Sequence, residues 1–168
     1  MIVLSVPAGA LLYLIFLLLQ PILPVAARLS AGDLLVLLAF LVAGIPGHEL
    51  LHALGWILAG RLPRQRVSFG FKLKALAPYV HLDGPVPARV YRIGILLPLL
   101  VLGLAPYVLG ISLANLRLMI FGLFFTLAAG GDLLVLWLLR GVPADALVED
   151  HPSRAGCVVY EQDEPRRL

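Results

Sequence analysis

The chain has 168 residues, of which 61% are hydrophobic and 14% are charged, and its formal net charge is +3. With a mean hydropathy of +0.98, it is far more apolar than a soluble domain of this length requires, so the sequence predicts an integral membrane protein. We attribute the basic excess to membrane topology and anionic lipid headgroups, because no aromatic and basic surface pattern indicates nucleic-acid binding. The single cysteine, Cys157, excludes a disulfide framework.

Four apolar runs are long enough for membrane spans, since an α-helix needs roughly 20 apolar residues to cross about 30 Å of hydrocarbon. The first run is also compatible with a cleaved signal peptide, but its length and the lack of a basic segment before it favour a retained span. The "SAGD" at residues 30–33 predicts the cap of the second helix. The predicted fold class is an all-α membrane protein with four transmembrane helices, at about Leu4–Ala27, Leu34–Ala59, Ile93–Leu113 and Leu118–Leu139.

Basic residues predict the orientation of these spans, because Lys and Arg collect in the short loops on the cytoplasmic side. With four spans, the two chain ends and the segment between spans two and three share one side. The other side carries only Arg28 and Arg117, so both termini are predicted to be cytoplasmic. The basic residues on that predicted cytoplasmic side are Arg61, Arg64, Arg66, Lys72, Lys74, Arg89, Arg92, Arg140, Arg154, Arg166 and Arg167.

The segment between spans two and three differs in pattern from the helices. Residues 67–75, "VSFGFKLKA", alternate apolar and polar side chains with the period of two that a half-buried strand has, and "PYVHL" at 78–82 predicts a returning strand. We predict a small β-hairpin at about residues 65–82, lying at the membrane surface. It would act either as a lid or as a free edge that pairs with an extended peptide. Residues 1–140 would form the membrane domain and residues 141–168 a cytoplasmic tail.

The second predicted span contains the sequence His48-Glu49-Leu50-Leu51-His52, which matches H-E-x-x-H. On a helix, residues four apart lie on one face, so both imidazoles can reach one metal ion. The intervening Glu49 is offset around the helix and suits a general base rather than a ligand. The alternative is a set of paired polar groups that hold helices together, but ionisable groups inside a membrane usually mark function.

A catalytic zinc site usually has three protein ligands, which requires one more residue. Asp132 is the only acidic residue in the interior of another predicted span. At 1.5 Å per residue, His52 lies about 14 Å from Arg61 and Asp132 about 12 Å from Arg140, so both fall in nearly the same layer of the membrane. Asp132 is therefore the predicted third ligand, and a buried partner for another polar group is the alternative.

Other polar residues are weaker candidates. His81 in the hairpin could fold over the site as a ligand or substrate-binding group, although a loop histidine is more often a local hydrogen-bond partner. His151 in the tail is predicted to be structural. Pro46 and its neighbouring glycines predict either a tolerated kink or a route for water to the metal.

Several stretches carry a family resemblance: "HELLHALGW" at 48–56, the basic strand-rich segment, "LLPLLVLGLAPYV" at 96–108, "GGDLLVLWLLR" at 130–140 and "DALVEDHPSRAG" at 145–156. From about residue 44 to 157 the chain resembles the "Putative zincin peptidase" family of small multispanning membrane proteins, related to the site-2 proteases. The resemblance implies a zinc intramembrane metalloprotease, with His48 and His52 as ligands and Glu49 as the catalytic acid/base. Asp132 would replace the aspartate of a later core helix. In site-2 proteases that aspartate often lies in an Asn-Pro-containing or a Leu-Asp-Gly context. Here it follows two glycines, and the Leu-Asp-Gly at 82–84 is predicted to be a turn.

The predicted function is zinc-dependent hydrolysis of a peptide bond in a membrane-embedded protein or peptide, near the cytoplasmic face of the lipid bilayer. An unwound substrate would pair with the edge at residues 67–75, where Phe69 and Phe71 are candidate substrate-binding residues. The alternatives are a metal-binding transporter or sensor and a noncatalytic membrane scaffold. The sequence identifies no particular substrate and no oligomeric state.

Overall fold

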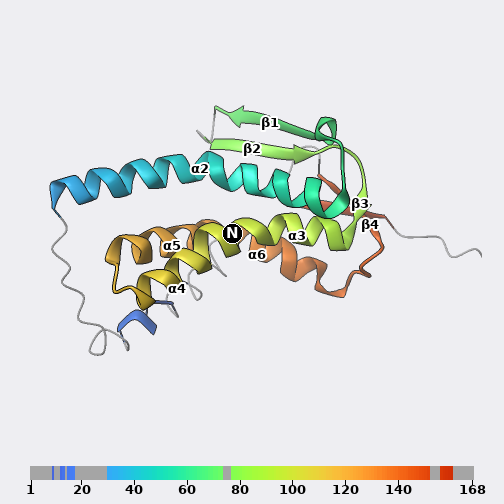
Figure 1. Ribbon diagram of the computed structural model, residues 1–168. Helices are drawn as coiled ribbons and strands as arrows, with labels where there is room; N and C mark the ends of the chain where they lie inside the picture. The colour runs from blue at the N-terminus through green and yellow to red at the C-terminus, as the bar shows by residue number, and fades with distance from the viewer. Residues whose placement is uncertain are drawn as a thin grey trace, which may run out of the picture.

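The computed structural model describes residues 30–73, 77–151 and 156–160, together with residues 9, 12, 13 and 15–17. The first predicted span therefore lies largely outside the described residues. The long helix α2 (Ala31–Gly60) runs between a β-hairpin on one side and the remaining helices on the other (Figure 1). Those helices are α3 (Ala88–Pro98), α4 (Ala105–Ser112), α5 (Leu116–Ala128) and α6 (Gly130–Leu138).

Two helical segments are long and apolar enough to cross a membrane: α2, and the 25-residue stretch Ala88–Ser112. The second stretch is continuous because a π-helical segment, Leu99–Leu104, joins α3 to α4. Pro98 and Pro106 flank this segment and lack the amide hydrogen that regular α-helical bonding requires, which favours the wider turn. The second and third predicted spans therefore correspond to membrane-length helices.

The fourth predicted span, Leu118–Leu139, is not one straight helix. α5 and α6 meet at Ala129 with a bend of 44°, and only if the pair counts as one broken span do the described residues contain a third crossing. Gly130 and Gly131, which begin α6, have low helix propensity and favour a break there. This corrects the sequence prediction, in which Asp132 lay in a helix interior.

The start of α2 follows the predicted cap. Ser30 accepts a hydrogen bond from the Asp33 amide at 3.2 Å, and the Asp33 carboxylate accepts one from the Ser30 amide at 2.9 Å. Asp33 also pairs with Arg117 at the start of α5, at 2.7 Å. This capping box and ion pair fix the N-terminal end of α2.

The predicted hairpin is present as β1 (Val67–Lys72) and β2 (Ala77–Leu82), paired antiparallel with Ser68 opposite His81. It follows a short 3₁₀ turn at Arg64–Arg66 and runs back alongside α2, with β2 nearer to the helix (Figure 1). A second sheet, not predicted, has the order β3-β4-β5. Its strands are β3 (Val86–Pro87), β4 (Leu147–Asp150) and β5 (Cys157–Tyr160), so the predicted tail contributes two strands.

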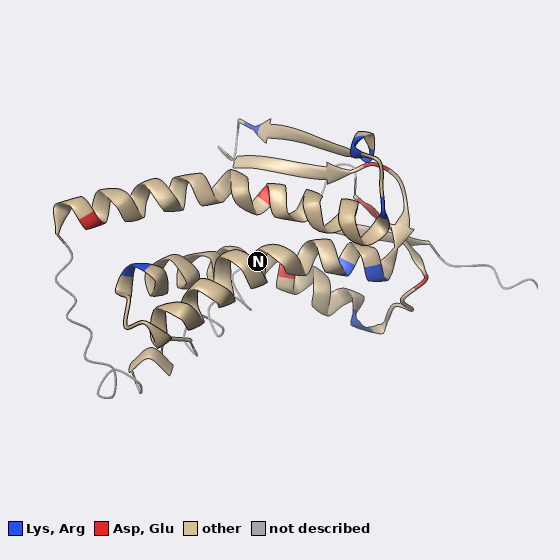
Figure 2. Ribbon diagram, viewed as in Figure 1, with Lys and Arg blue, Asp and Glu red and all other residues tan. Residues whose placement is uncertain are grey.

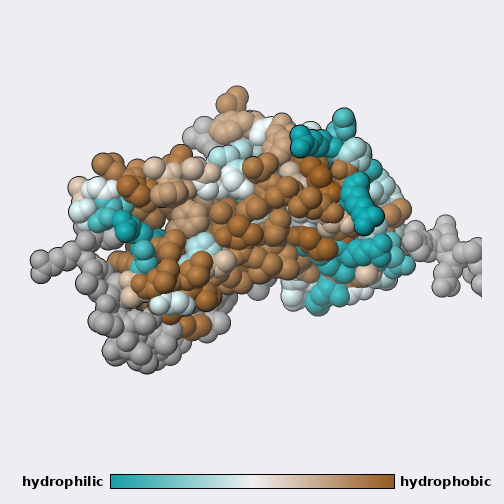
Figure 3. All heavy atoms as spheres, viewed as in Figure 1, coloured by the Kyte–Doolittle hydropathy of each residue, from teal (hydrophilic) through white to brown (hydrophobic). Residues whose placement is uncertain are grey.

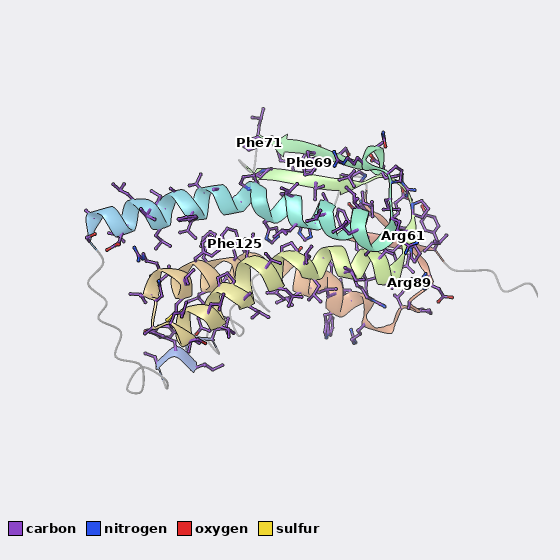
Figure 4. The ribbon with its side chains drawn as sticks, in the orientation of Figure 1. Arg61, Phe69, Phe71, Arg89 and Phe125 are labelled. Carbon is purple, nitrogen blue, oxygen red and sulfur yellow. The ribbon has the colours of Figure 1, made fainter. Side chains whose placement is uncertain are left out.

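The distribution of residues along the molecule is that of a membrane protein. Hydrophobic residues cover the middle of the visible face and hydrophilic ones gather toward its ends (Figure 3). Most basic residues lie where α2 ends and α3 begins (Figure 2), and Arg61 and Arg89 are close to this end (Figure 4). The buried core at this end contains Trp56, Leu82, Tyr91, Leu139 and Val148. Leu139 begins the 3₁₀ turn Leu139–Gly141, which follows α6.

Helices α2 and α3 approach each other through two glycines. A Cβ atom added at Gly55 would lie 2.6 Å from the Gly94 Cα, and one added at Gly94 would lie 2.1 Å from the Trp56 ring. The absence of side chains at both positions therefore allows the close backbone approach of the two helices.

We predict that Gly55→Ala destabilises the protein by about 1–3 kcal/mol, because the added methyl group must push α3 away. Gly47→Ala is the matched control in the same helix, since a Cβ there has no atom within 4 Å. Thermal unfolding in detergent should show a lower midpoint for the first variant and an unchanged or higher midpoint for the second. Equal midpoints for the two variants would contradict the close approach.

Candidate metal centre

The H-E-x-x-H sequence is helical, and it presents both histidines on the same side of α2. The His48 and His52 rings meet edge to face with centroids 4.8 Å apart, and only 7% of the His52 surface is exposed. Phe125 from α5 stacks on His48 at 6.4 Å and lies between α5 and α2 (Figure 4). It contacts α2 at Gly44, where a Cβ would lie 2.3 Å from the Phe125 ring. The histidines are thus held in an apolar, closely packed position.

Asp132, in the first turn of α6, meets both histidines. Its Oδ2 lies 3.1 Å from His48 Nε2, and its Oδ1 lies 3.5 Å from His52 Nε2. One ligand atom from each of the three residues lies within 4.8 Å of the others. The structure therefore brings together the three residues that the sequence predicted as ligands, although Asp132 reaches them from a helix start. At that position the positive end of the helix dipole also favours the carboxylate.

The hydrogen bonding of His52 tests whether these residues fit a metal ion. His52 Nδ1 lies 2.9 Å from the backbone carbonyl oxygen of Gly94, which can only accept, so Nδ1 donates. In a neutral ring, Nε2 then carries a lone pair that faces an Asp132 oxygen, and two acceptors 3.5 Å apart require a cation or proton between them. Donation of the second ring nitrogen to a carbonyl is also the usual support of a metal-bound histidine.

The donor set is suited to zinc. Two imidazole nitrogens and one carboxylate oxygen form a common catalytic zinc set, with metal–ligand distances of about 2.0–2.2 Å. Ligand atoms around a tetrahedral ion at those distances lie about 3.4 Å apart, close to the two His–Asp distances of 3.1 and 3.5 Å. His48 directs Nε2 to Asp132, whereas its Nδ1 is buried and has no hydrogen-bond partner among the described residues. The residues fit a divalent metal.

A partly buried arginine, Arg92, holds the helix that carries Asp132. Arg92 of α3 donates through Nη2 to the backbone carbonyls of Leu139 and, at 2.5 Å, Val142. These carbonyls follow the end of α6, where a cation offsets the negative end of the helix dipole. Arg92 therefore fixes α6 against α3, the same helix that supplies the Gly94 carbonyl to His52.

Glu49 points to the hairpin and not to the histidines. Its Oε2 accepts a hydrogen bond from the Val80 amide in β2 at 2.9 Å. Its Oε1 has no hydrogen-bond partner among the described residues. Glu49 lines one cavity with His48, His52 and Asp132, so a carboxylate lies beside the three candidate ligands without belonging to that group.

That cavity has a volume of about 670 Å³. Its walls come from α2, from the hairpin, from α3 and α6, and from the chain around β4 and β5. α6 contributes the apolar residues Leu134, Val135 and Leu138, whereas the hairpin contributes polar residues and Val80. The site is therefore a space of peptide dimensions with one apolar and one polar wall.

Asp150 in β4 is a polar centre that the sequence analysis missed. Its Oδ1 accepts from the Tyr91 hydroxyl at 2.5 Å, and its Oδ2 accepts from the Leu82 amide at 2.8 Å. Tyr91 stacks on Trp56, and Trp56 stacks on His52, each with centroids 5.7 Å apart. Glu49 and Asp150 thus bind two amides, those of Val80 and Leu82, on the edge of β2 away from β1. Only the "DHPS" stretch of the resemblance pointed near Asp150.

The remaining candidates have more peripheral positions. His81 lines the cavity, but its ring nitrogens lie 3.5 Å from Asp150 and 3.7 Å from Asp83, and it is outside the metal-ligand group. Phe69 and Phe71 are 59% and 55% exposed on the opposite face of the hairpin, and they do not line the cavity. Burial and the neighbouring Asp150 raise the pKa of the Cys157 thiol, which disfavours a thiolate ligand.

Comparison with known proteins identifies the family. The family described as "Putative zincin peptidase" matches residues 40–147. The chain belongs to this family. The match covers the part of α2 that contains the H-E-x-x-H sequence and all of α6 with Asp132, and it supports a metallopeptidase. No curated protein and no solved structure matches the chain.

We predict that Asp132→Ala weakens zinc binding more than about 100-fold. Loss of residues that merely support a ligand typically costs 10–100-fold, and loss of a ligand should cost more. Competition with a fluorescent chelator on metal-depleted protein measures the affinity. Asp145→Ala removes an exposed carboxylate elsewhere and should leave it unchanged. Wild-type affinity in the Asp132 variant would eliminate this residue as a ligand.

We predict that Asp150→Ala loosens the hairpin, because the Leu82 amide and the Tyr91 hydroxyl both lose their acceptor. Leaving buried donors unpaired costs about 1–3 kcal/mol. Hydrogen exchange followed by mass spectrometry should show faster exchange over β2. The control is Asp83→Ala, since the Asp83 side chain is 49% exposed and lies no closer than 3.7 Å to His81. Unchanged exchange in the Asp150 variant would show that other contacts hold β2.

Proposed function

We propose that this protein is a zinc-dependent intramembrane metalloprotease that hydrolyses peptide bonds of membrane-embedded substrates near the cytoplasmic face. The observation that carries the proposal is the position of Glu49. It shares a cavity of about 670 Å³ with His48, His52 and Asp132, within helices of membrane length. A structural polar cluster needs no cavity and no additional carboxylate. A hydrolase needs both.

The residues of the chain divide the reaction between them. When bound, zinc would supply Lewis acidity, which polarises a carbonyl and makes water a nucleophile near neutral pH. Glu49 takes a proton from the water that attacks the scissile carbonyl, and it delivers a proton to the amine as the carbon–nitrogen bond breaks. The Val80 amide, bonded to Oε2, keeps the carboxylate turned so that Oε1 is available for this transfer.

The proposed orientation places the basic end of the molecule in the cytoplasm, with both chain termini on that side. It is supported by the described basic residues Arg61, Arg64, Arg66, Arg89, Arg92 and Arg140, which follow or flank the ends of the apolar helices. Glu49 lies 11 residues before the end of α2, or about 17 Å along the helix from that surface. A substrate would therefore be cleaved inside the membrane.

The hairpin contributes to substrate binding in a different way from the one that its sequence suggested. A substrate strand added to the outer edge of β1 would lie two strand spacings, about 10 Å, from β2 and the amide that binds Glu49. The face with Ser68, Tyr79 and His81 instead lines the cavity. We propose that an unwound substrate segment lies between this face and α6, with its carbonyl near Glu49.

We predict that Glu49→Gln retains zinc at one ion per chain and loses proteolysis by at least about 100-fold, the lower range for removal of a general base. Glutamine keeps the shape and still accepts the Val80 hydrogen bond, but it cannot take a proton. Metal analysis and cleavage of a membrane-span peptide in vesicles measure the two properties.

Asp33→Asn is the matched control, because this carboxylate lies at the opposite end of α2. It should retain both zinc and cleavage. Loss of zinc in the Glu49 and Asp132 variants alike would instead favour a metal-binding site without hydrolysis. Zinc binding by wild-type protein together with intact membrane peptides would contradict the proposed activity.

A further inference from the structure

A lysine side chain lines the cavity of the metal centre, and the proposed reaction does not use it. Five hairpin residues line the cavity: Ser68, Lys72, Tyr79, Val80 and His81. Cross-strand pairing places all of them except Val80 on one face. Among the described residues that line it, Lys72 is the only Lys or Arg. It is the last residue of β1, at the end of the hairpin that lies far from the basic end of the molecule.

The position of the Lys72 ammonium group is set by an aromatic ring. Its Nζ lies 5.1 Å from the centroid of the Tyr79 ring. That ring lies across Gly70, the residue paired with Tyr79, since a Cβ at Gly70 would be only 2.4 Å from it. A cation over an aromatic face is stabilised by about 0.5–2 kcal/mol. Gly70 and Tyr79 therefore form a support that holds the ammonium group beside the cavity.

Lys72 is exposed, and it lies beyond Glu49 when measured from the basic end of the molecule. Val80 meets Glu49 about 17 Å from the end of α2. Lys72 pairs with Ala77, three residues further along the hairpin, which adds about 10 Å. In Figure 2 this basic residue at the end of β1 stands apart from those at the other end of the molecule. The neighbouring Phe71 and Leu73 are 55% and 78% exposed, as expected for side chains that contact lipid.

Lys72 brings a positive charge to the wall of the cavity that we propose as the substrate site. A cation in such a wall can bind an anionic group of a substrate through charge-assisted hydrogen bonds. Among the described residues, no carboxylate forms an ion pair with Lys72. The acidic cavity residues Glu49, Asp132 and Asp150 are already engaged with Val80, the histidines and Tyr91.

We propose that Lys72, supported by Tyr79, is a subsite that binds a carboxylate of the substrate. This inference rests on the proposed protease function and specifies its substrate class. An extended chain covers about 3.3 Å per residue, so the carboxylate would lie about three to five residues from the scissile bond, toward the hairpin end. It would come from an Asp or Glu side chain or from a free chain terminus, which share the same chemistry.

Membrane-span peptides that differ at one position test the subsite. Cleavage of a neutral parent peptide by zinc-loaded protein first locates the scissile bond by mass spectrometry. A series then places Asp, or Asn as its neutral counterpart, two to six residues away on either side. A further pair ends at the same positions with a carboxylate or an amide. The ratio of kcat/KM within each pair reports recognition of charge, and the two kinds of pair distinguish side chain from terminus.

We expect wild-type protein to prefer the charged peptide by about tenfold on one side of the bond only, chiefly through KM. Lys72→Arg should retain the preference, and Lys72→Met should bring the ratio to about one. Lys72→Glu should reverse it in favour of a peptide with Lys at that position. Arg64→Met removes a basic residue outside the cavity and should leave the preference intact. Zinc content should be the same in all four variants.

Equal ratios in wild type and Lys72→Met would overturn the subsite while leaving the protease function standing. A preference that follows the anionic lipid content of the vesicle, and not the peptide charge, would overturn it as well. If no peptide is cleaved, the protease proposal fails, and binding of the labelled peptides to Glu49→Gln protein decides the subsite separately. A dissociation constant that is independent of peptide charge would then refute it.

Discussion

Two imidazoles and a carboxylate, enclosed within 4.8 Å of one another by apolar helices, impose the strongest constraint on this molecule. Water does not solvate them well. The Gly94 carbonyl fixes the proton of neutral His52 on Nδ1, so His52 Nε2 and Asp132 Oδ1, which lie 3.5 Å apart, are both acceptors. Positive charge must be supplied between them, because a buried charge without a partner is strongly unfavourable. A metal ion meets this requirement, and the surrounding packing then serves to hold three ligands from two helices at one point.

Helix α3 holds the two helices of the site, α2 and α6, in place. Its Gly94 allows α2 to approach and at the same time supplies the carbonyl that orients His52. Two residues earlier, Arg92 binds the carbonyls beyond the end of α6 and thereby positions the helix that begins near Asp132. One helix therefore supports both sides of the site. A displacement of α3 would separate the ligands even though it contributes none itself.

Sequence patterns were informative where the chemistry is local. The H-E-x-x-H spacing located both histidines and Glu49. Asp132 was predicted as the third ligand because few ionisable residues occur in the apolar runs and because its position along its helix matches that of His52. The hairpin and the Ser30 cap were likewise encoded within a few residues. Non-local contacts were not accessible in this way. The pairing of β3 with β4 joins residues about 60 positions apart through a two-residue strand, so Asp150 could not be recognised as the acceptor for Leu82 and Tyr91.

The alternation in β1 correctly indicated a strand, but it did not show which side chains line the cavity. Phe69 and Phe71 are exposed, whereas Ser68 and Lys72 at the alternate positions line the cavity. Val67, on the same face as the two phenylalanines, packs against the core. The apolar face of the strand therefore has a core-facing end and an exposed end, and alternation alone cannot distinguish the two.

The hydrogen bond between Glu49 and the Val80 amide links the proposed proton-transfer group to the hairpin. Any displacement of β2 that breaks this hydrogen bond would also remove the donor that orients the Glu49 carboxylate. In the proposed protease, the rate of hydrolysis would therefore depend on the position of the hairpin as well as on the metal ligands.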